Sequence, residues 1–79
     1  MKFEGLIEIF GCYEFKDENT DQILQLSKNI SKNINENENY LYSVITSLYN
    51  SGLLKYKITL NNIFWFWTHN NKQDVLELK

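Results

Sequence analysis

The feature that most constrains the fold is an amphipathic segment that ends at a glycine and runs directly into a strand-like segment. Within "YLYSVITSLYNSGLL", apolar residues recur at the i, i+3, i+4 and i+7 spacing of a buried helical stripe: Leu41, Val44, Ile45 and Leu48. Gly52 follows at the position where a left-handed residue ends a helix. The pattern predicts a helix over residues 38–51.

The residues after this helix predict a two-stranded antiparallel hairpin over residues 54–68. Residues 55–60 alternate lysine or threonine with tyrosine, isoleucine or leucine, and residues 63–68 are rich in β-branched and aromatic side chains. Asn61 and Asn62 lie between the two runs and form the expected turn, although Asn-Asn suits a left-handed turn less well than Asn-Gly.

A second helix is predicted over residues 21–30. Thr20 occupies the expected N-cap position, Asp21 suits the first turn, and three apolar residues form the stripe: Ile23, Leu26 and Ile30. The asparagine-rich segment "SKNINENEN" reads as the connection to the next helix.

The residue pattern of the first segment, residues 3–15, fits both a helix and a strand. Its apolar residues fit a helical stripe, whereas "LIEIF" also alternates as a strand does, and Gly5 and Gly11 both weaken a helix. We expect a helix here, and the start of a last helix in residues 70–79.

Length and composition indicate one α+β domain, mostly helical, spanning residues 1–79. No apolar run approaches a membrane span, and glutamates interrupt the N-terminal segment where a signal core would lie, so we expect a cytoplasmic protein. Cys12 and His69 are the only residues of their kinds, which leaves no disulfide and no structural zinc site. We expect no metal or cofactor, a buried Cys12 and a surface His69.

Helices followed by a hairpin form the layout of a winged helix-turn-helix, in which the third helix reads DNA and the hairpin is the wing. The stretch "LYSVITSLYNSGLL", the preceding "DQILQLSKNIS" and the aromatic "FWFWT" resemble the PadR-like transcriptional regulators over about residues 20–70. The resemblance implies a winged-helix fold and a DNA-binding regulator. Unlike that family, the segment 33–54 carries no cation.

The candidate DNA contacts are lysines for phosphates and uncharged polar side chains for base edges. The third helix has a polar face without charge, where a solvated helix would show Lys and Glu. The candidates are Lys28, Lys32, Asn39, Tyr42, Ser43, Ser47, Asn50, Lys55, Lys57, Asn61 and Asn62.

Strand alternation places Ile63, Trp65 and Trp67 on one face of the hairpin and Phe64 and Phe66 on the other. We expect the tryptophans in the core and the phenylalanines at a protein interface. A homodimer or a complex with another protein is expected, through these phenylalanines or the first helix.

No catalytic constellation stands out, because Glu4 and Glu8 lack a neighbouring nucleophile or base at a recognisable spacing. We therefore expect a protein that is not an enzyme. The alternative to a DNA-binding regulator is a winged-helix module that binds a protein, such as a small inhibitor or immunity-type protein, through its acidic N-terminal third.

Overall fold

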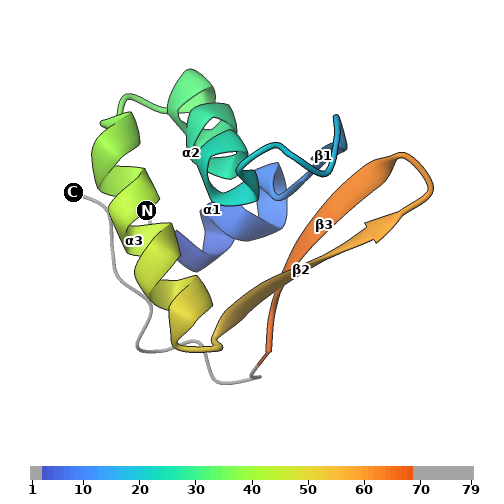
Figure 1. Cartoon of the computed structure of the whole chain (residues 1–79). Helices are drawn as coiled ribbons and strands as arrows, with labels where there is room; N and C mark the ends of the chain where they lie inside the picture. The colour runs from blue at the N-terminus through green and yellow to red at the C-terminus, as the bar shows by residue number, and fades with distance from the viewer. Residues whose placement is uncertain (1–2, 69–79) are drawn as a thin grey trace.

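The computed structural model describes residues 3–68 of the chain. The elements follow in the order α1 (Phe3–Phe10), β1 (Cys12–Glu14), α2 (Gln22–Asn33), α3 (Glu38–Asn50), β2 (Leu54–Thr59) and β3 (Asn62–Trp67). The three strands form one antiparallel sheet in the order β1-β3-β2. The helices pack together, and the β2–β3 hairpin extends away from them (Figure 1).

Helices α2 and α3 both begin at a side-chain cap. The Asp21 carboxylate accepts hydrogen bonds from the backbone N–H groups of Ile23 and Leu24, at 3.1 and 3.2 Å. The prediction of Thr20 as the cap was therefore wrong by one residue; the Thr20 hydroxyl donates instead to the Asp17 carboxylate at 3.2 Å. The predicted helix at residues 38–51 is confirmed, with Asn37 as its cap.

The end of α3 is closed by a Schellman motif, as the glycine predicted. Gly52 has a φ of 84°. Its N–H donates to the Tyr49 carbonyl and the Leu53 N–H donates to the Leu48 carbonyl, both at 3.1 Å. The Thr68 hydroxyl, at the far end of the hairpin, donates to the Gly52 carbonyl at 2.6 Å. The helix end is thus bonded to the last residue of the described chain.

The first segment contains both a helix and a strand. Helix α1 stops at Phe10, and after Gly11 the chain continues as β1, whose Cys12 pairs with Phe64 of β3. The expectation of a sheet limited to a two-stranded hairpin was therefore wrong. Gly11 makes this possible, because its carbonyl accepts the Trp65 N–H at 2.7 Å in a space that has no room for a side chain.

The hairpin turn lies one residue earlier than predicted. Thr59 pairs with Asn62, so the two loop residues are Leu60 and Asn61 rather than Asn61 and Asn62. Leu60 adopts a φ of 56° and is 92% exposed. Asn62 is held in the sheet because it pairs with both Thr59 and Glu14. The register of the third strand therefore overrides the local preference of asparagine for the turn.

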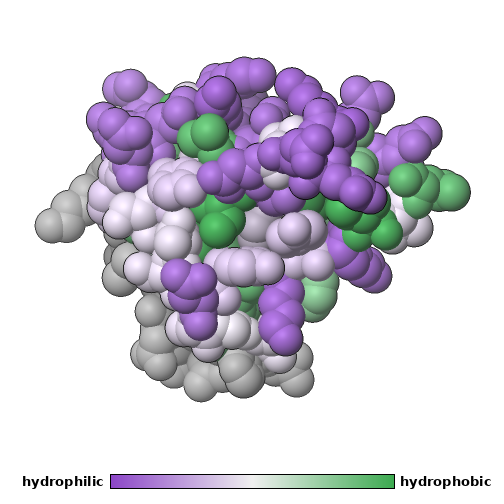
Figure 2. All heavy atoms as spheres, viewed as in Figure 1, coloured by the Kyte–Doolittle hydropathy of each residue, from purple (hydrophilic) through white to green (hydrophobic). Residues whose placement is uncertain are grey.

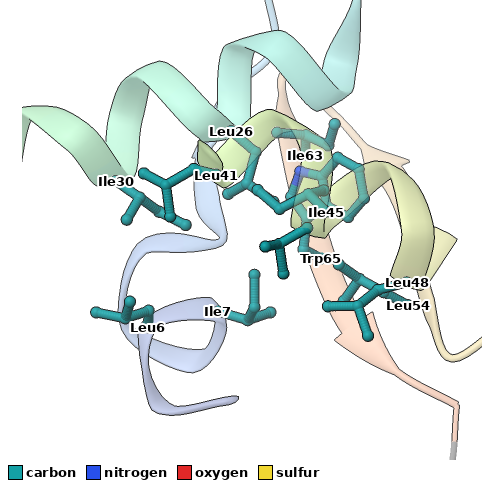
Figure 3. Packing of buried hydrophobic residues seen from close by; sticks show 11 residues of the cluster. Leu6, Ile7, Leu26, Ile30, Leu41, Ile45, Leu48, Leu54, Ile63 and Trp65 are labelled. Carbon is teal, nitrogen blue, oxygen red and sulfur yellow. The ribbon is translucent and has the colours of Figure 1, made fainter. Parts of the chain in front are cut away.

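The core is built from all three helices and the inner face of the sheet (Figure 3). The predicted stripe of α3 is buried, as are Leu26 and Ile30 of α2, whereas Ile23 is half-buried. Ile63 and Trp65 meet these residues from β3. The expectation of a buried Cys12 was wrong. Its neighbour Tyr13 points toward the core, so strand alternation places the Cys12 thiol on the exposed outer face. His69 and the expected helix at residues 70–79 lie outside the described residues.

Gly11→Ala and Gly5→Ala should shift stability in opposite directions. A Cβ at Gly11 would clash with the Ile7 carbonyl oxygen and would lie 3.0 Å from the Trp65 Cβ. The backbone at this junction must then move, and we expect a loss of about 1–3 kcal/mol in the free energy of unfolding.

Gly5 is the matched control, since it lies in α1 with nothing within 4 Å of its would-be Cβ. Alanine there should add about 0.5–1 kcal/mol through helix propensity. Urea unfolding measures the change in the free energy of unfolding for each variant. Equal changes would contradict the close contact at Gly11.

Candidate nucleic-acid interface

The exposed side of α3 carries a stripe of uncharged polar side chains. Its members are Asn39, Ser43, Ser47 and Asn50, all exposed, and we call them the α3 stripe. Their spacing keeps them on one side of the helix, away from the buried stripe that includes Leu41 and Ile45. The surface over the middle of α3 is largely pale, hence weakly polar, in Figure 2. Four of the predicted base contacts therefore lie together.

Tyr42 lies apart from the α3 stripe and has a structural partner. Its hydroxyl donates to the Asp21 Oδ2 at 2.7 Å, while the Asp21 Oδ1 caps α2. This hydrogen bond raises the pKa of Tyr42, because the nearby carboxylate favours the protonated phenol. Tyr42 ties the start of α2 to α3, and its hydroxyl could donate a hydrogen bond to a base only if this bond broke.

The candidate lysines form two pairs on two elements. Lys28 and Lys32 are exposed on α2, one turn apart, on the side away from its buried residues. Lys55 and Lys57 are exposed on β2. Asn61 and Asn62 are exposed at the tip of the hairpin. Within residues 3–68, these four candidate phosphate contacts thus lie on a helix before α3 and on a strand after it.

Acidic residues flank the N-terminal end of α3. Glu36 and Glu38 stand on either side of the cap Asn37. Residues 3–68 contain five lysines and eight acids, a net charge of −3. Glu36 and Glu38 therefore place negative charge at the N-terminal end of α3, whereas Lys55 and Lys57 follow its C-terminal end on β2.

An aromatic cluster fixes the angle between α3 and the hairpin. The rings of Tyr49 and Tyr56 stack with centroids 6.0 Å apart, and the rings of Tyr56 and Trp65 are 4.9 Å apart. The Trp65 indole N–H donates to the Tyr13 hydroxyl at 2.9 Å. Sequence analysis missed Tyr49 and Tyr56; their spacing of seven residues across Gly52 was the only available signal. Tyr49, Tyr56 and Lys55 also line an open hollow of about 480 Å³.

The outer face of the sheet carries the two phenylalanines predicted to form an interface. Phe66 is 40% exposed and Phe64 is half-buried, whereas Trp65 is buried on the inner face and Trp67 is half-buried against the core. Ile58 and Leu60 are further exposed apolar residues toward the hairpin tip, where hydrophobic surface gathers in Figure 2.

Neither a metal cluster nor a membrane helix is found within residues 3–68. No three His, Cys, Asp or Glu side chains of this part of the chain come together in a way that could hold a metal ion. Its helices are too short or too polar to cross a bilayer.

Comparison of the chain with models of known protein families, with curated proteins and with solved structures finds no match.

Tyr13 should limit the stability of the fold at alkaline pH. Burial is the main reason that its pKa rises from 10.0 to about 12, opposed in part by the hydrogen bond from Trp65. The folded state therefore holds this proton more tightly than the unfolded state. Its contribution to stability is complete below about pH 10 and is lost as the pH rises toward 12.

Urea unfolding of Tyr13→Phe across pH 7–12 tests this limit. The variant should lose about 1–3 kcal/mol at neutral pH, because the buried Trp65 N–H loses its acceptor. Its stability should then fall less steeply above pH 10 than that of the wild type. Tyr40→Phe, at an exposed site on α3, should stay within about 0.5 kcal/mol of wild type at neutral pH. If the free energy of unfolding falls equally steeply above pH 10 in the wild type and in Tyr13→Phe, the raised pKa of Tyr13 is not the cause of the alkaline loss of stability.

Proposed function

We propose that the chain is a winged helix-turn-helix domain that binds duplex DNA and acts as a transcriptional regulator. The observation that carries this proposal is the α3 stripe, uncharged and exposed, on a helix that leads directly into a hairpin bearing Lys55 and Lys57. Helix α2 packs across α3 as the support helix of a helix-turn-helix does. The order of helices and strands agrees with this layout, with α3 as the reading helix and β2–β3 as the wing.

The chemistry of the α3 stripe suits base edges better than phosphates. Asparagine offers a paired donor and acceptor that match adenine in the major groove, and serine can contact several bases. Asn39 lies near the acidic end of α3 and Asn50 near the end that adjoins β2. Because Lys55 and Lys57 follow this second end on β2, Ser47 and Asn50 are the leading base contacts.

The lysine count predicts weak binding by one subunit. Lys28, Lys32, Lys55 and Lys57 would neutralise about two to four phosphates, and log affinity should fall with log salt at about −0.9 per contact. Two subunits would double this slope. We infer a homodimer, and α1 offers a contact surface because Ile9 is 64% exposed on it.

Duplex binding is tested by fluorescence anisotropy with random duplex DNA from ~50 to ~200 mM salt. Replacing Lys55 and Lys57 with alanine should weaken binding about equally on all sequences and reduce the salt slope by about 1.8 per subunit, or about 3.6 in the inferred dimer. Replacing Asn50 with alanine should cost about 1–3 kcal/mol on a preferred site and relax discrimination there. Lys16→Ala is the charge-matched control, exposed in the loop after β1, and should leave the slope unchanged.

The second candidate function is a protein-interaction module, and the acid excess favours it. Glu36 and Glu38 lie at the start of the exposed helix, where an incoming phosphate would be repelled. If duplex DNA does not bind at ~50 mM salt, where counterion release favours binding, the regulator proposal fails and this candidate takes its place.

The proposed dimer is tested by light scattering of the purified chain. Ile9→Glu should convert a dimer into a monomer, because it places a charge in the apolar contact. Ile9 is exposed in the single chain, so the fold of the variant should remain intact by circular dichroism. A wild-type monomer at high micromolar concentration would contradict the homodimer.

A further inference from the structure

We propose that the outer face of the sheet binds single-stranded nucleic acid, with bases stacked on Phe64 and Phe66 and phosphates neutralised by Lys55 and Lys57. This surface is separate from the α3 stripe, which would contact a duplex. The proposal therefore goes beyond the proposed function.

The register of the sheet places one lysine beside each ring. Lys55 pairs with Phe66 and Lys57 pairs with Phe64 across the antiparallel β2–β3 ladder. Directly paired residues point to the same face and lie about 5 Å apart. The intervening pair, Tyr56 and Trp65, points to the opposite face, into the core. On the outer face, a phenylalanine ring and a lysine thus lie side by side at each of two neighbouring cross-strand pairs.

The rings and the lysines are accessible among the described residues. Phe66 is 40% exposed and both lysines are exposed, while Phe64 is half-buried. The helices contact the residues of the inner face, which include Leu54 and Ile63. The outer face therefore presents flat apolar surface next to positive charge, the combination that single-stranded nucleic-acid grooves use.

The spacing of the rings selects a single strand over a duplex. Alternate residues on a strand are about 6.7 Å apart, twice the ~3.4 Å between stacked bases. Neighbouring bases of a stacked helix cannot each lie on one of these rings, and a duplex hides its base faces. An extended single strand can splay its bases and place one on each ring.

Two observations weigh against a protein as the occupant. Strands β2 and β3 have six residues each and β1 has three. At a spacing of about 4.8 Å they give a face of about 240 Å², well below the ~800 Å² per partner of a stable interface. Lysine is also depleted at the centre of protein interfaces, yet here one lysine adjoins each ring. Two or three nucleotides fit the available area. Glu14, on the β1 side, directs the phosphates toward β2.

The test measures binding of a fluorescent oligothymidylate of about ten nucleotides, within the usual site size, to the full chain at ~50 mM salt. Phe66→Leu keeps an apolar side chain but removes the stacking surface, and should raise Kd about 5- to 150-fold. Phe66→Tyr restores a ring and should bind like the wild type. Circular dichroism checks that both variants fold.

Asn50→Ala on the α3 stripe separates this site from the duplex site. It should leave oligothymidylate binding unchanged while it weakens duplex binding. If oligothymidylate does not bind, or if Phe66→Leu binds it as well as the wild type does, the proposal is overturned even where duplex binding persists. A dimer that Phe66→Leu dissociates, in a chain that does not bind oligothymidylate, would show that the outer face is a protein interface instead.

Discussion

The close approach of Trp65 to Gly11 is the contact on which the arrangement of the other elements depends. The Trp65 backbone N–H donates to the Gly11 carbonyl, and its indole N–H donates to the Tyr13 hydroxyl. The same ring packs against Tyr56 of β2 and meets the edge of Tyr49 at the end of α3. One residue therefore joins the α1–β1 junction, both long strands and the last turn of α3.

The sheet built around this contact separates two kinds of surface. Its inner face is used mostly by the core, and the aromatic and uncharged polar residues proposed to contact nucleic acid lie on the outer face and along α3. Cations are scarce on both surfaces, and Lys55 and Lys57 lie next to the end of α3 in the chain and on the outer face in space. The proposed duplex and single-strand sites would share these two lysines and differ in everything else, so one pair of charges could serve only one ligand at a time.

Local patterns in the sequence predict much of this fold, and contacts distant in sequence account for the rest. Helix α3, its glycine end and the two long strands follow from periodicity and residue type within short windows. Strand β1 has three residues, too few for a pattern, and exists because β3 offers an edge some fifty residues later. Contacts distant in sequence also shift the hairpin turn by one residue to Leu60 and Asn61, since Asn62 pairs with Thr59 on one side and with Glu14 on the other.

The candidate site was predictable to a similar extent. The α3 stripe follows from helical spacing alone, and the alternation of Phe64 and Phe66 with Trp65 follows from the strand. The partner of Tyr42 could not be predicted, because its contact with Asp21 depends on how α2 crosses α3. The pairing of a lysine with each phenylalanine also required the register, which the expected Asn61-Asn62 turn would have changed.

The pairing of β1 with β3 also fixes the order in which the chain can fold. Helices α2 and α3 are neighbours in sequence and pack closely, so they can associate as soon as both have been synthesised. Strand β1 cannot pair until β3 has been synthesised. The Tyr13 hydroxyl, which accepts the Trp65 indole N–H, lies 52 residues earlier in the chain than Trp65. During translation Tyr13 and the end of α1 emerge long before their partners, and the sheet closes only after nearly all of residues 3–68 have left the ribosome. Closure of this long loop is the slowest step that the topology imposes on the described domain.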